Sequence, residues 1–147
     1  MPYAEEFKLM PDTDRWVVAK APVWLESDGA ILNQIEKCAI NLAGRSTSAP
    51  SFHLSISDLR GEHSALTARL CSEITERAAI SNLKQAVECS QCLRHRDCSV
   101  SLDDFGTGLA SFEYLKRQPV DYAQGFGIGK PRALAELLAA PLRAPKA

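Results

Sequence analysis

Apolar residues recur at the three- and four-residue spacing of amphipathic helices along much of the chain, and short apolar runs lie between these stretches. The spacing predicts helices over residues 14–25, 30–36, 55–70, 82–95, 111–117 and 133–140. Pro22 lies inside the first stretch, and because proline lacks an N–H it is expected to kink or end that helix.

The short apolar runs predict strands over residues 38–42, 70–76 and 99–103, each bounded by residues typical of turns. Alternation along the second strand places Cys71, Glu73 and Thr75 on one face. Residues 46–53 combine Ser, Thr and Pro, which predicts a loop. Helices that alternate with short strands favour the α/β class.

Composition places the chain among globular domains. It has 147 residues, of which 46% are hydrophobic and 24% charged, with a net charge of −1. That charge gives no basic field for a nucleic-acid polymer, and no apolar run approaches the ~20 residues of a membrane span. The first residues lack the pattern of a signal peptide, so a cytoplasmic protein with reduced thiols at its five cysteines is expected.

Polar residues end three of the predicted strands: Asn41, Glu73, and the pair Asp103 and Asp104. Carboxylate and amide oxygens without sulfur or imidazole suit a hard cation such as Mg²⁺ or Mn²⁺. Neighbouring strand residues face opposite ways, so the two aspartates converge only if the strand stops there, as the nearby glycines at 106 and 108 allow. The alternative is a turn cap at the aspartates and a surface glutamate.

Two rival sites have weaker patterns. Cys89 and Cys92, with His95 and Cys98, resemble a single zinc knuckle without a second one, and Cys92 is expected on an exposed helix face. The glycines at 125, 127 and 129 precede Lys130, but the spacing of a phosphate-binding P-loop is absent.

Four motifs in order carry a family resemblance: residues 41–44 (NLAG), 73–76 (EITE), 103–108 (DDFGTG) and 124–126 (QGF). Together with their flanks, over about residues 4–131, they resemble the EAL domain, a family of cyclic-di-GMP phosphodiesterases. The resemblance implies a (β/α)8 barrel that binds cyclic-di-GMP over two divalent cations and hydrolyses it to linear pGpG.

The same resemblance implies roles for single residues. The metal ligands, for Mg²⁺ or Mn²⁺, would be Asn41, Glu73, Asp103 and Asp104. Gln124 is similar to the glutamine that lies near the ligand at the last strand of the family. The loop that couples dimerisation to the metal site would comprise Phe105, Gly106, Thr107 and Gly108.

The sequence also departs from the family pattern. It begins after the position of the Glu-Ala-Leu motif, and two distant regions of the family are joined at Asp121 and Tyr122, as though the chain between them had been deleted. The lysine of the Lys-Ile-Asp strand and the glutamate that is the candidate general base lie in that missing part. We therefore assign no catalytic residue.

The length predicts an incomplete barrel, because 147 residues cannot close eight β/α units. Residues 1–140 are expected to form a truncated domain of four strand segments, followed by a tail over residues 141–147. An open half-barrel is expected to expose strand edges and an apolar inner face.

Several interpretations remain open at this point. The first is a degenerate cyclic-di-GMP signalling domain that has lost hydrolysis, and the second is a working phosphodiesterase. The third is a non-catalytic module that forms a homodimer or binds another EAL protein, or a gene remnant without a selected function.

Overall fold

A single parallel sheet organises the chain in a computed structural model that describes residues 7–27, 29–58, 64–106 and 119–133. Its strands lie in the order β1-β2-β3-β4, so neighbours in the sheet are also neighbours in sequence. They are β1 (Cys38–Leu42), β2 (Leu70–Thr75), β3 (Ser99–Asp103) and β4 (Tyr122–Ala123). The four expected strand segments and the α/β class are thereby confirmed.

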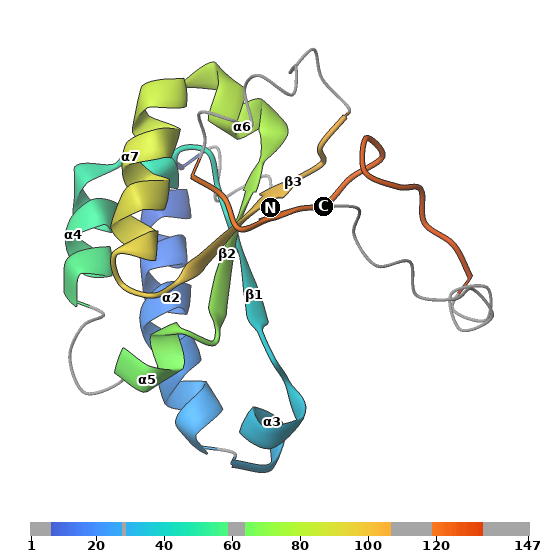
Figure 1. The fold of residues 1–147 in the computed structure, drawn as a ribbon. Coiled ribbons are helices and arrows are strands. Elements are labelled where there is room, and N and C mark those ends of the chain that lie inside the picture. Colours follow the sequence, from blue (N-terminus) through green and yellow to red (C-terminus); the bar gives the residue numbers. More distant parts are fainter. Residues whose placement is uncertain (1–6, 28, 59–63, 107–118, 134–147) are drawn as a thin grey trace.

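The helices lie on one face of this sheet, as Figure 1 shows for α2, α4 and α7. In chain order they are α2 (Met10–Ser27), α3 (Gly29–Gln34), the 3-10 helix η1 (Ser46–Ser48), α4 (Pro50–Asp58), α5 (Ser64–Thr67), α6 (Glu76–Ser81) and α7 (Leu83–Arg94). Among the residues that the structure describes, no helix is long and apolar enough to cross a membrane.

The hydrophobic core fills the space between the helices and the sheet. Every second strand residue, including Ile40, Ile74 and Leu102, is buried under the helices. The helices contribute the other half of this core, with Leu25 from α2, Phe52 and Ile56 from α4, and Ala86 and Leu93 from α7. The core therefore depends on one layer of helices over one layer of sheet.

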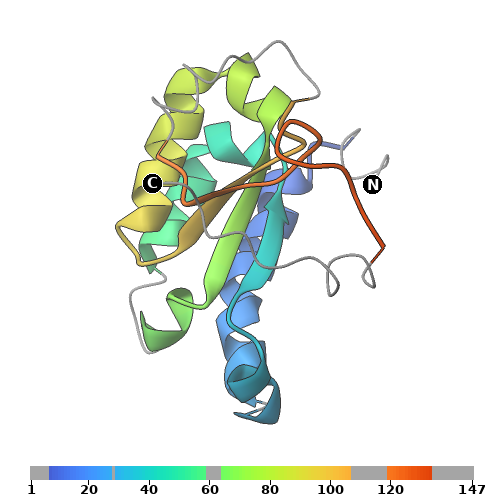
Figure 2. The same cartoon turned by 45° about the vertical axis from the view of Figure 1, so that its right-hand side comes forward.

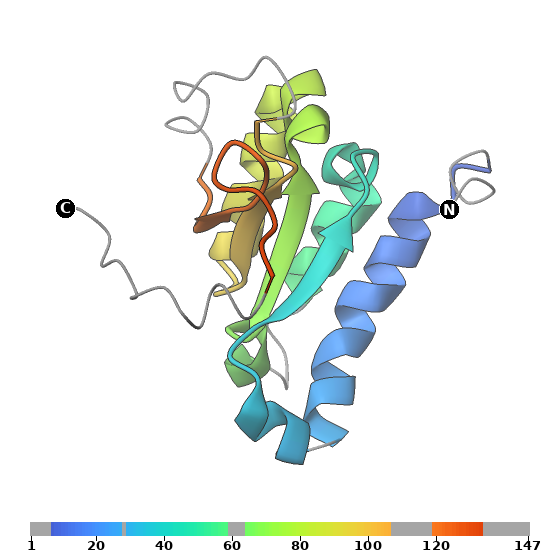
Figure 3. The same cartoon turned by 90° about the vertical axis from the view of Figure 1, so that its right-hand side faces the viewer.

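The opposite face of the sheet, which we call the open face, carries no helix in the described part of the chain (Figures 2 and 3). The strand residues that alternate with the buried set lie on it, among them Asn41, Glu73, Thr75, Ser101 and Asp103. The expectation of an exposed apolar inner face was therefore wrong. The strands alternate between apolar residues toward the helices and mainly polar residues on the open face, so each strand is amphipathic.

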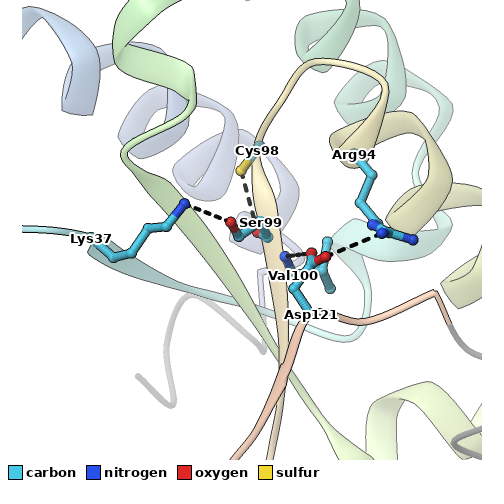
Figure 4. A network of polar contacts seen from close by, with 6 residues as sticks. All are labelled: Lys37, Arg94, Cys98, Ser99, Val100 and Asp121. Atoms are coloured by element: carbon cyan, nitrogen blue, oxygen red, sulfur yellow. Dashed lines mark hydrogen bonds and ion pairs between the residues drawn. The ribbon is translucent and has the colours of Figure 1, made fainter.

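Strand β4 joins the sheet through a network at Asp121, the residue before it (Figure 4). Its carboxylate accepts a hydrogen bond from the Val100 N–H at 2.9 Å and pairs with the Arg94 guanidinium at 3.2 Å. The backbone N–H of Asp121 donates to the Val100 carbonyl at 2.8 Å. The junction that the sequence analysis interpreted as a splice is thus held to both β3 and α7.

A second part of the same network lies at the amino end of β3. The Lys37 ammonium donates to the Ser99 hydroxyl at 2.8 Å and to the Ala68 carbonyl at 2.6 Å. The Cys98 thiol lies 3.6 Å from the Ser72 hydroxyl. These contacts tie together the chain segments that enter β1, β2 and β3.

Several helix predictions need correction. Helix α2 continues through Pro22 to Ser27, because that proline is buried between Val18 and Leu25 and the packing on both sides outweighs one lost backbone bond. Residues 46–53 are not a loop, since they contain η1 and the start of α4. The single helix expected over residues 55–70 is replaced by the end of α4, by α5 and by the first residue of β2.

Helix α6 was missed because it has six residues and follows β2 without a loop. The predicted strand over residues 70–76 ends one residue earlier, where the Thr75 hydroxyl accepts a hydrogen bond from the Ala78 N–H at 3.3 Å. The strands predicted over residues 38–42 and 99–103 are confirmed at both ends. The helices predicted over residues 111–117 and 133–140 fall almost entirely outside the described residues, as does the tail.

Candidate functional site

The carboxyl end of β3 brings two aspartates to one place. Asp103 is the last residue of the strand, and Asp104 adopts a left-handed backbone conformation with φ of 57°. Because the strand geometry stops between them, both side chains line the same cleft rather than opposite faces of the sheet. Both aspartates line this cleft, and their convergence on a shared ligand stays a prediction.

This cleft has a volume of about 910 Å³ and lies between the end of β3 and the segment that follows β4. Gln124, predicted to lie near the ligand, is one of its lining residues. The others combine acidic, basic and apolar side chains with two glycines: Asp103, Asp104, Ala123, Gly125, Phe126, Ile128, Gly129, Lys130, Pro131 and Arg132.

The two walls of the cleft interlock through their backbones. The Phe105 N–H donates to the Gln124 carbonyl at 2.9 Å, and the Gly127 N–H donates to the Phe105 carbonyl at 2.7 Å. Gly106 has a φ of 91°, and a Cβ on it would collide with the backbone of Gly127. The DDFG and QGFG motifs are therefore two halves of one structural unit.

A buried carboxylate on α6 forms a hydrogen bond with this unit. Glu76 in the first turn of α6 is fully buried and accepts a hydrogen bond from the Gly106 N–H at 3.1 Å. In the sequence, Glu76 is the last residue of the EITE motif and has no assigned role. Its burial could not be foreseen, because it requires the immediate turn from β2 into α6.

Asn41 and Glu73 lie on neighbouring strands of the open face, directly opposite each other in the parallel register. Asp103 follows on β3, opposite Thr75 and two residues beyond the position that pairs with Glu73. Burial raises the pKa of the Glu73 carboxyl above 4.5, and the negative charge of Asp103 raises this pKa further. Neither Asn41 nor Glu73 lines the cleft that contains the two aspartates.

The chemistry of these donors suits a hard cation, because all of them are oxygens and the charge of Asp103 helps to raise the pKa of the Glu73 carboxyl. Within the described residues, however, no group of three His, Cys, Asp or Glu side chains converges closely enough to hold a metal ion. The set of Asn41, Glu73, Asp103 and Asp104 as ligands of Mg²⁺ or Mn²⁺ therefore stays a prediction.

The turn after β1 is positioned by Asp14 from α2. This buried carboxylate accepts a hydrogen bond from the Ala43 N–H at 2.8 Å and another from the Ser46 hydroxyl at 2.5 Å. In the sequence, Asp14 stands only as the first residue of a predicted helix. In the structure its carboxylate holds the turn that follows β1. This turn fixes the end of the strand that carries Asn41 on the open face.

The cysteines form no alternative site in the described residues, where no three-residue metal group is found. Cys89 is buried in α7, and burial raises the pKa of its thiol to about 12. Cys92 is half-buried and packs against the core, so its predicted position on an exposed helix face was wrong. Helix α7 contacts α4 and α6 as well as β3. More of its surface is therefore covered than a single apolar stripe along the helix predicts.

Of the predicted dimerisation loop, Phe105 is buried and Gly106 is exposed, whereas Thr107 and Gly108 lie outside the described residues. In the sequence, Lys130 stands out only beside the glycines that resemble a P-loop, and Arg132 has no assigned role. Both line the cleft. Their position depends on the backbone of residues 124–129 returning over the end of β3, which residue spacing alone does not indicate (Figure 2).

Comparison with known proteins gives a family match over most of the chain. A family model described as EAL domain matches residues 1–127. The cyclic di-GMP phosphodiesterase PdeB of Shewanella oneidensis is 39% identical over 121 residues, and PdeF of Escherichia coli is 33% identical over 121 residues. Each match covers 82% of this chain, which spans only 14% and 16% of the length of these two relatives.

A solved structure agrees with the sequence matches. The FimX EAL domain of Xanthomonas citri, determined in complex with c-diGMP, superposes with a TM-score of 0.74 at 26% identity. The match covers 85% of this chain and 49% of that chain. The four-stranded sheet with its helices is accordingly a partial, incomplete version of a TIM-type barrel domain.

Proposed function

The chain belongs to the EAL domain family of cyclic-di-GMP phosphodiesterases, and from this premise we propose that it is a cyclic-di-GMP-binding signalling domain that has lost hydrolysis. The observation that carries the proposal is the cleft of about 910 Å³ at the end of β3, lined by Asp103, Asp104 and Gln124. Its volume falls in the range of small-molecule sites.

The chemistry of the cleft supports a nucleotide ligand. Phe126 exposes its ring, which offers a stacking surface for a purine base. The Gln124 side chain supplies both a donor and an acceptor for a base edge or a ribose hydroxyl. Polar groups that converge on an apolar wall are typical of sites that orient a small ligand.

The direct pairing of β4 with β3 supports the loss of hydrolysis. Tyr122 in β4 pairs with Ser101 in β3, so no strand lies between the two regions that the family pattern separates. The lysine and the candidate general base of the family belong to the chain that is missing at this junction. Losses within one catalytic unit are strongly non-additive, and removal of a single member already lowers the rate by orders of magnitude.

Mg²⁺ or Mn²⁺, when bound, would neutralise phosphate charge and activate water for attack. The residues that would hold it are Asn41, Glu73, Asp103 and Asp104, on the open face and at its edge. The chain's own contribution is to hold these oxygens on adjacent strands. Gln124 and Phe126 would then orient the nucleotide beside them.

Thermal melting of the purified chain, with and without cyclic-di-GMP and Mg²⁺, tests this function. A ligand at about 100 times its Kd stabilises the native state by roughly 2.7 kcal/mol, which raises Tm by about 5–10 °C in a domain of this size. Asp104→Asn should lower the shift obtained with Mg²⁺. A cooperative melt without any ligand-induced shift would contradict binding, and a broad melt would favour the gene remnant.

Hydrolysis is tested separately by chromatography of the nucleotide after long incubation with Mn²⁺. We expect cyclic-di-GMP to remain intact. Formation of pGpG that disappears in Asp103→Asn would establish a working phosphodiesterase instead, because contaminating enzyme would be indifferent to that substitution.

An interaction module is the second candidate function. Strand β1 has a partner on one side only in the described sheet, and an unpaired edge can accept another strand. Homodimerisation, or association with another EAL protein, would cover this edge. Sedimentation of the chain alone and mixed with a full-length EAL domain tests it, and a monomer in both samples would rule it out.

A further inference from the structure

The cleft contains two basic side chains to which neither the fold nor the family motifs give a role. Among the described residues that line it, Lys130 and Arg132 are the cationic ones, and both come from the segment that follows β4. They share the cleft with the carboxylates of Asp103 and Asp104. The lining therefore contains two charges of each sign.

The acidic side of the cleft disfavours an anionic ligand. Asp103 and Asp104 bring two negative charges to the end of β3, and Glu73 stands close enough for Asp103 to raise its pKa. A phosphodiester that enters near these carboxylates is repelled unless positive charge lies close by. Within the lining of the cleft, Lys130 and Arg132 supply that charge.

The backbone that carries the two cations is fixed immediately before them. The N–H groups of Ile128 and Gly129 both donate to the Gly125 carbonyl at 3.0 Å, and the Gly127 N–H donates to the Phe105 carbonyl at 2.7 Å. This turn is therefore anchored to the end of β3. The long basic side chains start from an ordered base, which lowers the entropy lost when they bind an anion.

The same turn supplies an apolar surface next to the cations. Phe126 is 60% exposed and Ile128 is 57% exposed, and both line the cleft. A ligand with phosphates and aromatic bases would meet both kinds of group at once. Simple anions such as sulfate would use only the basic residues.

We propose that Lys130 and Arg132 form a phosphate subsite that binds one phosphodiester of a cyclic dinucleotide while Phe126 contacts a base. This inference rests on the proposed function and names the residues that decide whether the anion enters. The subsite holds the ligand without a divalent cation. The guanidinium of Arg132 donates two parallel hydrogen bonds to phosphate oxygens, and the Lys130 ammonium acts as a point charge.

Calorimetric titration of cyclic-di-GMP into the full chain in EDTA tests the subsite. We expect measurable binding by the unaltered chain and a loss of affinity of about tenfold or more in each of Lys130→Ala and Arg132→Ala. Lys84→Ala is the matched control, because this lysine on α7 is 86% exposed and lies outside the lining of the cleft. Circular-dichroism melts of all variants verify that they remain folded.

The Arg132→Lys variant distinguishes a role in binding phosphate from a merely structural role of Arg132. It retains the charge but loses the paired donors, so its affinity should lie between those of the unaltered chain and Arg132→Ala. Rising salt should weaken binding to the unaltered chain more steeply than to the alanine variants. Equal affinity in the unaltered chain and both alanine variants would overturn the subsite.

Inorganic pyrophosphate separates failure of the subsite from failure of the proposed function. If the chain binds pyrophosphate through Lys130 and Arg132 but not cyclic-di-GMP, the phosphate subsite stands and the proposed ligand is wrong. If it binds cyclic-di-GMP equally well after both substitutions, the function stands and the subsite is wrong. Failure to bind either probe in EDTA overturns the subsite, and failure to bind cyclic-di-GMP with Mg²⁺ as well overturns the proposed function too.

Discussion

Glu73 is a carboxylate on the open face whose charge lowers the stability of the fold at neutral pH. Burial raises the pKa of its carboxyl above 4.5, and the charge of Asp103 adds to this rise. The folded state then binds a proton more tightly than the unfolded chain. Stability from this group is present at low pH and declines as the pH rises from about 4.5 through the folded-state pKa.

Replacement of Glu73 by Gln removes the carboxylate that is disfavoured at neutral pH. We expect Glu73→Gln to raise the free energy of unfolding by about 0.5 kcal/mol at pH 7, a small value because solvent screens this partly exposed group. Below the folded-state pKa the two proteins should converge. Urea unfolding at several pH values measures the effect, and an equal gain at low and neutral pH would contradict the electrostatic cause.

Gly106 is the residue on which the contact between the two cleft walls depends most directly. Its φ of 91° and the closeness of the Gly127 backbone leave no space for a side chain. We expect Gly106→Ala to destabilise the chain by about 1–3 kcal/mol and to reduce any ligand-induced rise in Tm.

Gly29→Ala is the control for this substitution, because a Cβ at that position would meet nothing within 4 Å and its φ is not positive. Tm should stay the same or rise slightly there, since alanine restricts the unfolded chain. Similar melting losses in both variants would show that the close contact at Gly106 does not limit stability.

At the scale of elements, the attachment of β4 depends on Asp121. Asp121→Ala removes the acceptor for the Val100 N–H and the partner of Arg94, so it should cost about 1–2 kcal/mol. Asp121→Asn keeps an acceptor and loses only the charge, and about 0.5 kcal/mol is expected because the ion pair is partly exposed. Equal losses in the two variants by urea unfolding would assign the attachment to the ion pair alone.

The elements that sequence predicted best are those whose pattern is local. Strands β1 and β3 have short apolar runs bounded by turn residues, and their ends agree with the prediction. Pro22 shows the opposite case, because the packing that keeps α2 intact around it comes from residues far away in sequence. Helix α6 combines both difficulties, since it is short and begins where β2 ends.

The site was predictable to the extent that motifs identify residue types. Convergence of Asp103 and Asp104 required β3 to stop there, and the strand does end at Asp103, with both residues in the lining of the cleft. The return of residues 124–129 over that strand end was not predictable, because it rests on backbone contacts between Phe105 and Gly125 to Gly127. Lys130 and Arg132 were therefore not recognised as cleft residues.

At the scale of the whole molecule, the described part of the chain has an apolar surface on α2 that lies outside the hydrophobic core. On α2, Trp16 is 63% exposed and Trp24 is 53% exposed, and with Val17, Ala21 and Val23 they border a groove of about 420 Å³. Large apolar side chains that lie together on a surface promote association. Concentration-dependent association is therefore expected for the isolated chain.

Replacement of both tryptophans by Gln should reduce this association with a change of no more than about 0.5 kcal/mol in the free energy of unfolding. Sedimentation velocity over a range of concentrations measures it. Leu25→Ala is the contrasting variant, because this fully buried leucine of α2 should cost about 2–5 kcal/mol. Unchanged association in the double variant would place the contact elsewhere.

Strand β4, with two residues, gives the binding cleft a dynamic property of its own. The amides of Phe105, Gln124 and Gly127 bond between the two cleft walls, so a single local opening at this edge would release all three to hydrogen exchange. The helices and β1 to β3 would stay protected through that event. The cleft exists only while these hydrogen bonds are intact, so only this closed state can bind a ligand. The observed Kd then equals the Kd of the closed state divided by the fraction of molecules in that state. If the proposed function holds, substitutions at this edge change the affinity for cyclic-di-GMP without altering any group that touches the ligand.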